Sequence, residues 1–248
     1  MTLRLSSVLS AFLAAVIALG VGQAGAQSKL PIVVELFTSQ SCDQCPPADD
    51  YLGELAKRPD VIALSYHVSM WDYLGWKDTF ANEWTTARQE TYAAFLRERS
   101  LYTPQMVIGG TIHEVGSRRD KIAKAIDQRR ERSAPYLDIF VERVEGGKLA
   151  VLIPAGKMNQ RDVVVLLVRY DSSRKIAIEG GENRGRTMVY HNVVSDYRTL
   201  GMWYGQELEI HLNVADLRFG GRDGSVILVQ EAGSGRIIGA IQIDLNNL

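Results

Sequence analysis

The chain has 248 residues, a formal net charge of −1, 46% hydrophobic residues and 23% charged residues. These proportions are those of a globular protein, and they exclude a disordered chain, a collagen-like repeat and a disulfide-rich miniprotein. The near-neutral charge gives no reason to expect a nucleic-acid partner. The chain contains two cysteines, Cys42 and Cys45, so any thiol chemistry is concentrated in one short segment.

Residues 1–26 are predicted to be a secretory signal peptide that is removed from the mature protein. Arg4 precedes an apolar run at 8–21 that is short for a membrane span, and Ala-Gly-Ala at 24–26 provides a small-x-small cleavage pattern. An uncleaved membrane anchor is the alternative. Because no later apolar run is long enough to cross a bilayer, we expect a periplasmic or secreted protein that does not associate with the membrane after cleavage.

Strand-like and helix-like segments alternate from residue 31 to about residue 130. Apolar, β-branched runs at 32–37 and 61–66 are typical of buried strands, and a helix is expected between them. A helical insertion at about 67–100 follows, because large apolar residues recur there at helical spacing. A strand at 105–108 then turns through two glycines into a strand at 111–115, before a last helix.

The pattern changes near Pro135, which cannot continue the preceding helix. Residues 135–248 contain about eight short alternating or apolar runs divided by glycine-rich turns, which is typical of an antiparallel β-sandwich. We therefore predict one domain at 27–134 and an all-β domain at 135–248. The polar segment 179–186 is expected to be a hairpin loop that is able to dock on the first domain.

Cys42 and Cys45 follow the first strand at the start of the expected helix, and this spacing brings both sulfur atoms within reach of a disulfide. In an exported protein such a pair is open to thiol–disulfide exchange. Unpaired N–H groups at a helix start favour a thiolate, so Cys42 is the expected nucleophile and Cys45 the resolving thiol. An inert structural disulfide is the alternative, although so short a loop gains little entropy on closure.

Two features beside the cysteines modify this chemistry. The Asp43 carboxylate disfavours a neighbouring thiolate, which indicates a mild oxidant that acts as a reductase or an isomerase. Pro46 and Pro47 suit only the first turn of a helix and are expected to delay or kink it. The expected partners are protein or small-molecule thiols and disulfides, and no cofactor is expected beyond the redox-active disulfide.

The order of these elements around the Cys-x-x-Cys pair, with Thr103-Pro104 before the third strand, resembles the thioredoxin fold over about residues 31–130. The resemblance implies a mixed sheet flanked by helices and a cis proline that faces the cysteines. In that case Thr103 offers backbone groups to an extended substrate, whereas an ordinary trans proline is the alternative. The chain departs from thioredoxin because it lacks an additional N-terminal strand and helix and carries a longer helical insertion.

Three sequence segments point to a more specific family within the thioredoxin-like proteins. Glu-Leu-Phe-Thr-Ser at 35–39, the cysteine segment with the following Pro-Pro-Ala-Asp, and Tyr-Leu-Gly-Trp at 73–76 resemble a family of secreted bacterial thioredoxin-like proteins that has no established function. We therefore predict a thioredoxin-like α/β fold followed by an all-β, antiparallel, sandwich-like domain. The predicted function is that of an exported thiol–disulfide oxidoreductase.

Further side chains are candidates for the same site. His67 follows the second strand and would serve as a proton shuttle or substrate rim, with simple loop packing as the alternative. Glu35 is a candidate for proton transfer because thioredoxins carry a buried acid near their cysteines, and a strand-edge glutamate is the alternative. Trp71 and Trp76 would form a substrate-facing wall, unless they pack the insertion against the sheet.

A copper-binding or adaptor protein is the alternative function. Cys42, Cys45 and His67 would supply the thiolate and imidazole ligands that suit Cu(I). Thioredoxin-like copper-delivery proteins usually separate their cysteines by three residues, however, and this chain separates them by two. A structural zinc site is disfavoured, because it needs four ligands and the histidines are scattered.

Overall fold

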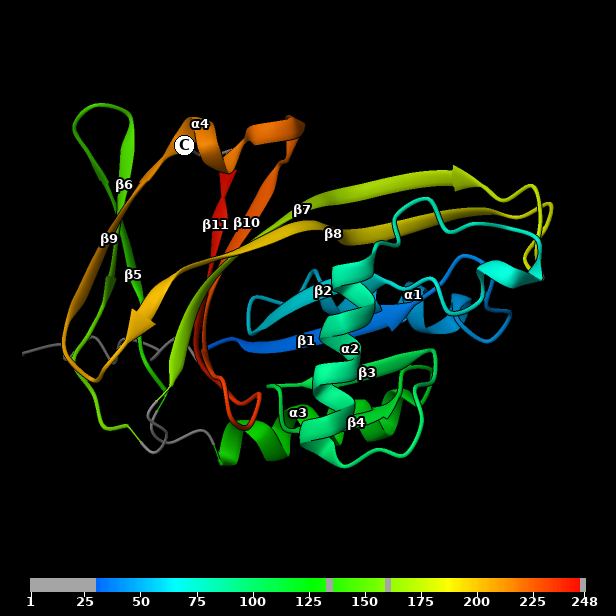
Figure 1. The fold of residues 1–248 in the computed structure, drawn as a ribbon, viewed down its shortest axis with the longest axis horizontal. Coiled ribbons are helices and arrows are strands. Elements are labelled where there is room, and N and C mark those ends of the chain that lie inside the picture. Colours follow the sequence, from blue (N-terminus) through cyan, green and yellow to red (C-terminus); the bar gives the residue numbers. More distant parts are fainter. Residues whose placement is uncertain (1–29, 133–135, 159–161, 246–248) are drawn as a thin grey trace, which may run out of the picture.

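The computed structural model describes residues 30–132, 136–158 and 162–245. The expected signal peptide at 1–26 and the expected domain boundary near residue 134 lie outside the described residues. Within the described residues, eleven strands form two sheets, and four α-helices accompany them (Figure 1). No helix of these three ranges is long and apolar enough to cross a membrane.

The first half of the chain alternates strands and helices, as its periodicity predicts. The two glycines at 109 and 110 have positive φ and make the tight turn of the predicted hairpin. In chain order the elements are β1 (Ile32–Thr38), α1 (Pro46–Leu55), β2 (Val61–His67), the 3₁₀ turn η1 (Asp72–Leu74), α2 (Glu83–Leu96), β3 (Gln105–Ile108), β4 (Ile112–Val115) and α3 (Arg119–Glu131).

The second half is made mostly of strands, but two of them are much longer than predicted. Short strands are expected throughout, but one strand has 15 residues and the strand that pairs with it has 17. The elements are β5 (Phe140–Val144), β6 (Lys148–Ile153), β7 (Val163–Ala177), β8 (Thr187–Trp203), β9 (Leu208–Asn213), α4 (Val214–Leu217), η2 (Phe219–Gly221), β10 (Gly224–Glu231) and β11 (Ile237–Asp244).

Strands from both halves form one continuous mixed sheet of eight strands among the described residues, in the order β11-β10-β7-β8-β2-β1-β3-β4. β2 is parallel to β1 and to β8, and β5, β6 and β9 form a separate antiparallel sheet. The prediction of a thioredoxin-like α/β domain followed by a separate β-sandwich is therefore wrong. Periodicity identifies strands, but it does not say which strand edges pair, and here β8 takes the edge of β2.

Side chains from both halves also share one core. α1 and α3 pack on one face of β1 to β4, where Val34 and Leu36 are buried. On the opposite face, beside α2, Phe37 and Tyr66 pack with β7 and β10 side chains, including Leu166. A further core fills the space between the three-stranded sheet and β7, β10 and β11. The two halves are therefore joined by packing as well as by strand pairing.

The long hairpin of β7 and β8 determines what surrounds the cysteines. It extends from the side of the three-stranded sheet to the opposite end of the molecule (Figure 1). Its tip, at residues 178–186, lies against the loop between β1 and α1. The second half of the chain thus contributes directly to the environment of Cys42.

Candidate functional site

The candidate site is the loop between β1 and α1, in which Cys42 and Cys45 form a disulfide. Their Cα atoms lie 5.4 Å apart. Cys42 is 3% exposed and Cys45 is fully buried. The oxidised pair therefore lies beneath other parts of the chain rather than on an open surface.

Pro46 and Pro47 do not delay α1, which begins directly at Pro46. A proline suits this position because its φ is helical and the first helical residues need no N–H partner. The N–H groups of Ala48 and Asp49 donate to the Cys45 carbonyl oxygen, at 2.9 and 3.1 Å. The helix start therefore offers a Cys42 thiolate fewer free donors than a start without prolines.

The tip of the β7–β8 hairpin covers the cysteine loop. The buried Asn183 side chain donates to the carbonyl oxygens of Gln40 and Cys42, at 3.0 and 2.8 Å. The Glu182 carboxylate accepts a hydrogen bond from the Asp43 backbone N–H at 3.3 Å. The expected docking of segment 179–186 is confirmed.

Trp76 holds the same loop from the side of the insertion. Its indole N–H donates to Gln40 Oε1 at 2.7 Å, and its carbonyl oxygen accepts from the Ser41 hydroxyl at 2.7 Å. Trp71 lies elsewhere, and its indole N–H donates to the Thr103 hydroxyl at 2.6 Å. The indole N–H of each tryptophan is therefore hydrogen-bonded. Trp76 contacts the loop that contains the cysteines, and Trp71 contacts Thr103, which is predicted to bind substrate.

Pro104 lies close to the start of α1, and the Thr103-Pro104 bond is cis, as the resemblance implies. A Cβ placed on Gly116 would lie 2.9 Å from Ala48 Cβ and 3.3 Å from Pro104 Cβ. The two residues thus flank the same glycine. The predicted substrate-binding segment and the first turn of α1 are consequently neighbours.

His67 is fully buried and faces α1 from the end of β2. Its Nδ1 is 2.8 Å from Asp78 Oδ2, and this oxygen also accepts from the Gln40 backbone N–H at 2.7 Å. The ring packs edge-on against Tyr190 of β8, with centroids 4.6 Å apart. His67 is therefore linked to the cysteine loop through Asp78, and it does not form a substrate rim.

Sequence reasoning missed Asp49, which lies one helical turn after Cys45. Its side chain is 2% exposed, and neither carboxylate oxygen has a hydrogen-bond partner among the described residues. Burial raises the pKa of Asp49 to about 7, and the charge of His67 opposes part of this shift. The sequence does contain a signal for this buried acid. Asp49 lies four positions after the second cysteine, among the apolar residues Ala48 and Leu52 of the same helix.

Glu35 does not belong to the cysteine site. Along β1 it faces α2 together with Phe37, whereas α1 packs on the opposite face. Glu35 Oε1 accepts from Arg88 Nε at 2.7 Å, and the Tyr92 hydroxyl donates to its other oxygen. Glu35 therefore does not lie beside the cysteines, and its predicted role in proton transfer there is wrong. It is also not a solvent-exposed glutamate at a strand edge, because it is fully buried.

The structure does not bring Cys42, Cys45 and His67 together as free copper ligands. Cys42 and Cys45 are joined in a disulfide, and Nδ1 of His67 is occupied by Asp78. Across residues 30–132, 136–158 and 162–245, no group of three or more His, Cys, Asp or Glu side chains is arranged to hold a metal ion. The copper-binding alternative stays a prediction.

Comparison with known proteins relates most of the chain to one family. The chain is 32% identical to a protein from Agrobacterium tumefaciens with an X-ray structure, with a TM-score of 0.77, covering 90% of this chain and 98% of that one. HBP35 of Porphyromonas gingivalis shares the fold at 12% identity and a TM-score of 0.60, covering 88% of this chain and 76% of that one. A search of curated proteins found no match.

The similarity to the Agrobacterium protein extends across both halves of the chain, which agrees with one continuous β-rich sheet and not with two separate units. A family model described as "Protein of unknown function (DUF1223)" matches residues 33–230. This match covers most of the 248 residues. The chain therefore belongs to the DUF1223 family.

Proposed function

We propose that this protein is an exported thiol–disulfide oxidoreductase whose reactive groups are Cys42 and Cys45. The observation that carries the proposal is the buried disulfide with the buried acid Asp49 one helical turn behind it. A disulfide that closes so short a loop contributes little to stability, so reactivity is the better explanation for it. The disulfide and the predicted signal peptide support a periplasmic or secreted location.

The proposed reaction is a two-step exchange. In the reduced protein, the Cys42 thiolate attacks one sulfur of a substrate disulfide, forms a mixed disulfide and releases the other substrate sulfur as a thiolate. The Cys45 thiolate then attacks Cys42 Sγ, which reforms the Cys42–Cys45 disulfide and releases the second substrate thiolate. The substrate is reduced by two electrons and the cysteine pair is oxidised, and an external thiol reductant restores the dithiol.

Asp49 supplies the proton acceptor that the second step requires. The Cys45 thiol must lose its proton before it attacks, and a carboxyl group with a pKa of about 7 can accept a proton near neutral pH. Asp49 and Cys45 lie one turn apart on the buried side of α1. His67, whose charge acts on Asp49, and Asp78, which contacts His67, are the neighbouring groups able to take up this proton.

The surroundings of Cys42 favour a reductase or isomerase over a strong oxidant. Strong disulfide oxidants depend on a stabilised thiolate in their reduced form. Here the Asp43 carboxylate lies next to Cys42 in the chain, and the two prolines remove N–H groups from the helix start. Both features disfavour the thiolate and so destabilise the reduced form, which makes the pair a weak oxidant that is expected to act as a reductase or isomerase on protein or small-molecule disulfides.

Thr103, Pro104 and Trp71 form the proposed substrate-binding side. Trp71 contacts Thr103, and Tyr73 beside it is 76% exposed, which leaves an aromatic surface free for a partner. An extended peptide next to Thr103 would gain backbone hydrogen bonds and this aromatic contact. Because the cysteines are buried, the 178–186 tip must move before such a peptide reaches Cys42.

The test is an insulin-reduction assay with dithiothreitol as the reductant. We expect the wild-type protein to accelerate precipitation of the reduced insulin chain, Cys42→Ser to abolish the acceleration, and Cys45→Ser to accumulate a mixed disulfide. Asp49→Asn is expected to slow resolution of the mixed disulfide at pH 7 by about 100-fold or more, as is typical when a general base is lost. A wild-type protein no faster than both serine variants would overturn the proposal.

A further inference from the structure

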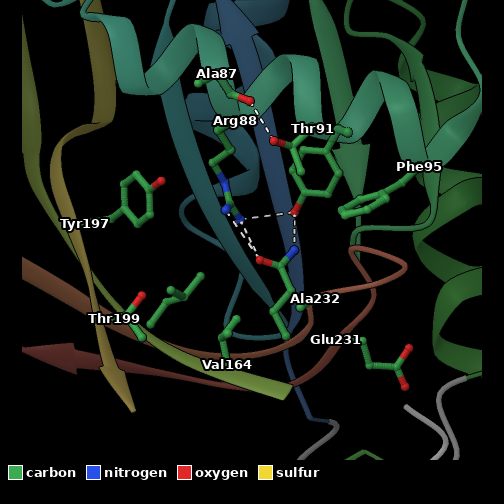
Figure 2. A pocket seen from close by; sticks show the side chains of 12 residues that line it. Ala87, Arg88, Thr91, Phe95, Val164, Tyr197, Thr199, Glu231 and Ala232 are labelled. Carbon is green, nitrogen blue, oxygen red and sulfur yellow. Dashed lines mark hydrogen bonds between the residues drawn. The ribbon is translucent and has the colours of Figure 1, made fainter. Parts of the chain in front are cut away.

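A pocket of about 260 Å³ lies between α2 and the strands β7, β8 and β10. It is on the face of the sheet occupied by α2, opposite the face on which α1 packs. Figure 2 shows Arg88, Thr91 and Phe95 of α2 on one side and Tyr197, Thr199 and Val164 on the other. The pocket is therefore separate from the cysteine site.

Arg88 directs an incompletely paired guanidinium into this pocket. The residue is 9% exposed, and its Nε donates to Glu35 Oε1 at 2.7 Å. Its Nη2 donates to the Tyr92 hydroxyl at 3.1 Å, but both contacts with Gln230 Oε1 are long, at 3.4 Å. A guanidinium has five N–H donors, so a ligand oxygen that approaches the Nη1 side would find a donor available.

The remaining lining of the pocket is both apolar and polar. Phe95 and Val164 provide apolar walls. Tyr197 and Thr199 also line the space and add hydroxyl groups to it. This combination of apolar walls with a few polar groups is typical of a small-molecule site.

The charges around the pocket select against an anionic ligand. The fully buried Glu35 already compensates the charge of Arg88. Glu231 also lines the pocket, and Arg236 pairs with it at 2.7 Å. Because Arg88 and Arg236 already have carboxylate partners, an added carboxylate ligand would bring a further negative charge into a partly buried space.

We propose that this pocket binds a small uncharged organic molecule with an apolar body and one carbonyl or amide oxygen that accepts hydrogen bonds from Arg88. A dry cavity of about 150 Å³ is known to admit benzene, so a volume of about 260 Å³ accommodates an aromatic ring with a short polar substituent. The pocket does not depend on the cysteine chemistry, and its test is independent of that proposal.

The test uses three probes of similar shape, namely benzamide, benzoate and toluene. In ¹H–¹⁵N NMR titrations of the full chain, benzamide is expected to cause saturable shifts at the Arg88 Nε–H and at the backbone amides of 87–95 and 230–232. Benzoate and toluene are expected to bind about fivefold more weakly or worse, because one adds a charge and the other leaves Arg88 without an acceptor. No saturable shift with benzamide, or tighter binding of benzoate, would overturn the proposal.

Two variants fill the pocket from opposite sides. Thr199→Trp on β8 and Ala87→Trp on α2 change exposed positions, and each is expected to weaken benzamide binding by about tenfold or more by occupying the cavity. Val189→Trp is the matched control, since Val189 is 40% exposed on the same strand and does not line the pocket. Equal benzamide affinities in all four proteins would show that the probe binds elsewhere and would refute the assignment.

Discussion

At the scale of single residues, the Asp49 carboxyl lies where water does not solvate its charge. Its pKa rises from 3.8 to about 7, chiefly through burial. Because the folded-state pKa is above the unfolded-state value, the folded protein binds an extra proton between these two pH values. The contribution of Asp49 to stability is therefore fully present below pH 3.8 and is lost as the pH rises to about 7.

Asp49→Asn is accordingly expected to increase stability at pH 8 and to flatten the pH dependence between about pH 4 and pH 7. The neutral amide avoids ionisation of a buried group, and a shift from 3.8 to about 7 corresponds to about 4 kcal/mol. Urea denaturation at several pH values measures the effect. The control is Asp50→Asn, an exposed carboxylate on the same helix, which should leave the profile unchanged. A wild-type-like slope in Asp49→Asn would contradict the assigned pKa.

At the scale of elements, the β7–β8 hairpin connects the second half of the chain to the cysteine loop. Asn183 at its tip is 141 residues from Cys42 in the sequence, yet it satisfies the Cys42 carbonyl oxygen. Gly181 allows this close approach, since a Cβ there would lie 2.8 Å from Ser41 Oγ. The tip therefore acts as a cover whose contacts must break before the disulfide is reached.

Asn183→Ala is expected to accelerate reduction of the Cys42–Cys45 disulfide by dithiothreitol. Two hydrogen bonds of about 1 kcal/mol each are lost, which raises the open population by about thirtyfold. Stopped-flow measurement of the reduction rate, followed by the change in tryptophan fluorescence, tests this expectation. Arg184→Ala on the same exposed loop is the control and should react like the wild type. Equal rates in the two variants would argue against a covering role.

At the scale of the whole molecule, turns from the two halves meet directly. A Cβ on Gly110, in the β3–β4 turn, would lie 1.8 Å from the Gly235 carbonyl oxygen in the β10–β11 turn. The Ile237 N–H donates to the Gly109 carbonyl oxygen at 3.1 Å nearby. These contacts add to the pairing of β2 with β8 and make the halves one folding unit.

Gly110→Ala is therefore expected to destabilise the entire protein. Gly147→Ala is the matched control, because Gly147 also has a positive φ, of 69°, but a Cβ there would meet nothing within 4 Å. The control should lose about 1–2 kcal/mol from the backbone conformation alone. Gly110→Ala should lose about 1–3 kcal/mol more, because the two turns must separate. Thermal or urea unfolding compares them, and equal losses would refute the role of the contact.

A fragment of residues 30–132 is expected not to fold cooperatively. It would expose the edge of β2 and the face on which Leu166, Val194 and Val226 pack in the intact chain. Exposed strand edges and apolar surface of this kind favour aggregation over a unique fold. Amide dispersion in NMR spectra and the denaturation curve of the fragment measure this directly. A sharp unfolding transition equal to that of the full chain would contradict a single folding unit.

The sequence by itself determined the local features of this protein. Periodicity located the strands and helices of the first half, and the spacing of Cys42 and Cys45 anticipated their disulfide. These features depend on residues a few positions apart, whose relative geometry the backbone restricts strongly.

Only the tertiary structure decided the rest. It placed β8 on the edge of β2, Asn183 on the cysteine loop, and Glu35 opposite Arg88 rather than beside the cysteines. It also buried Asp49 and thereby changed its pKa. The physical reason is that edge pairing, burial and charge compensation depend on which distant segments meet, and the pattern of neighbouring residues does not contain that information.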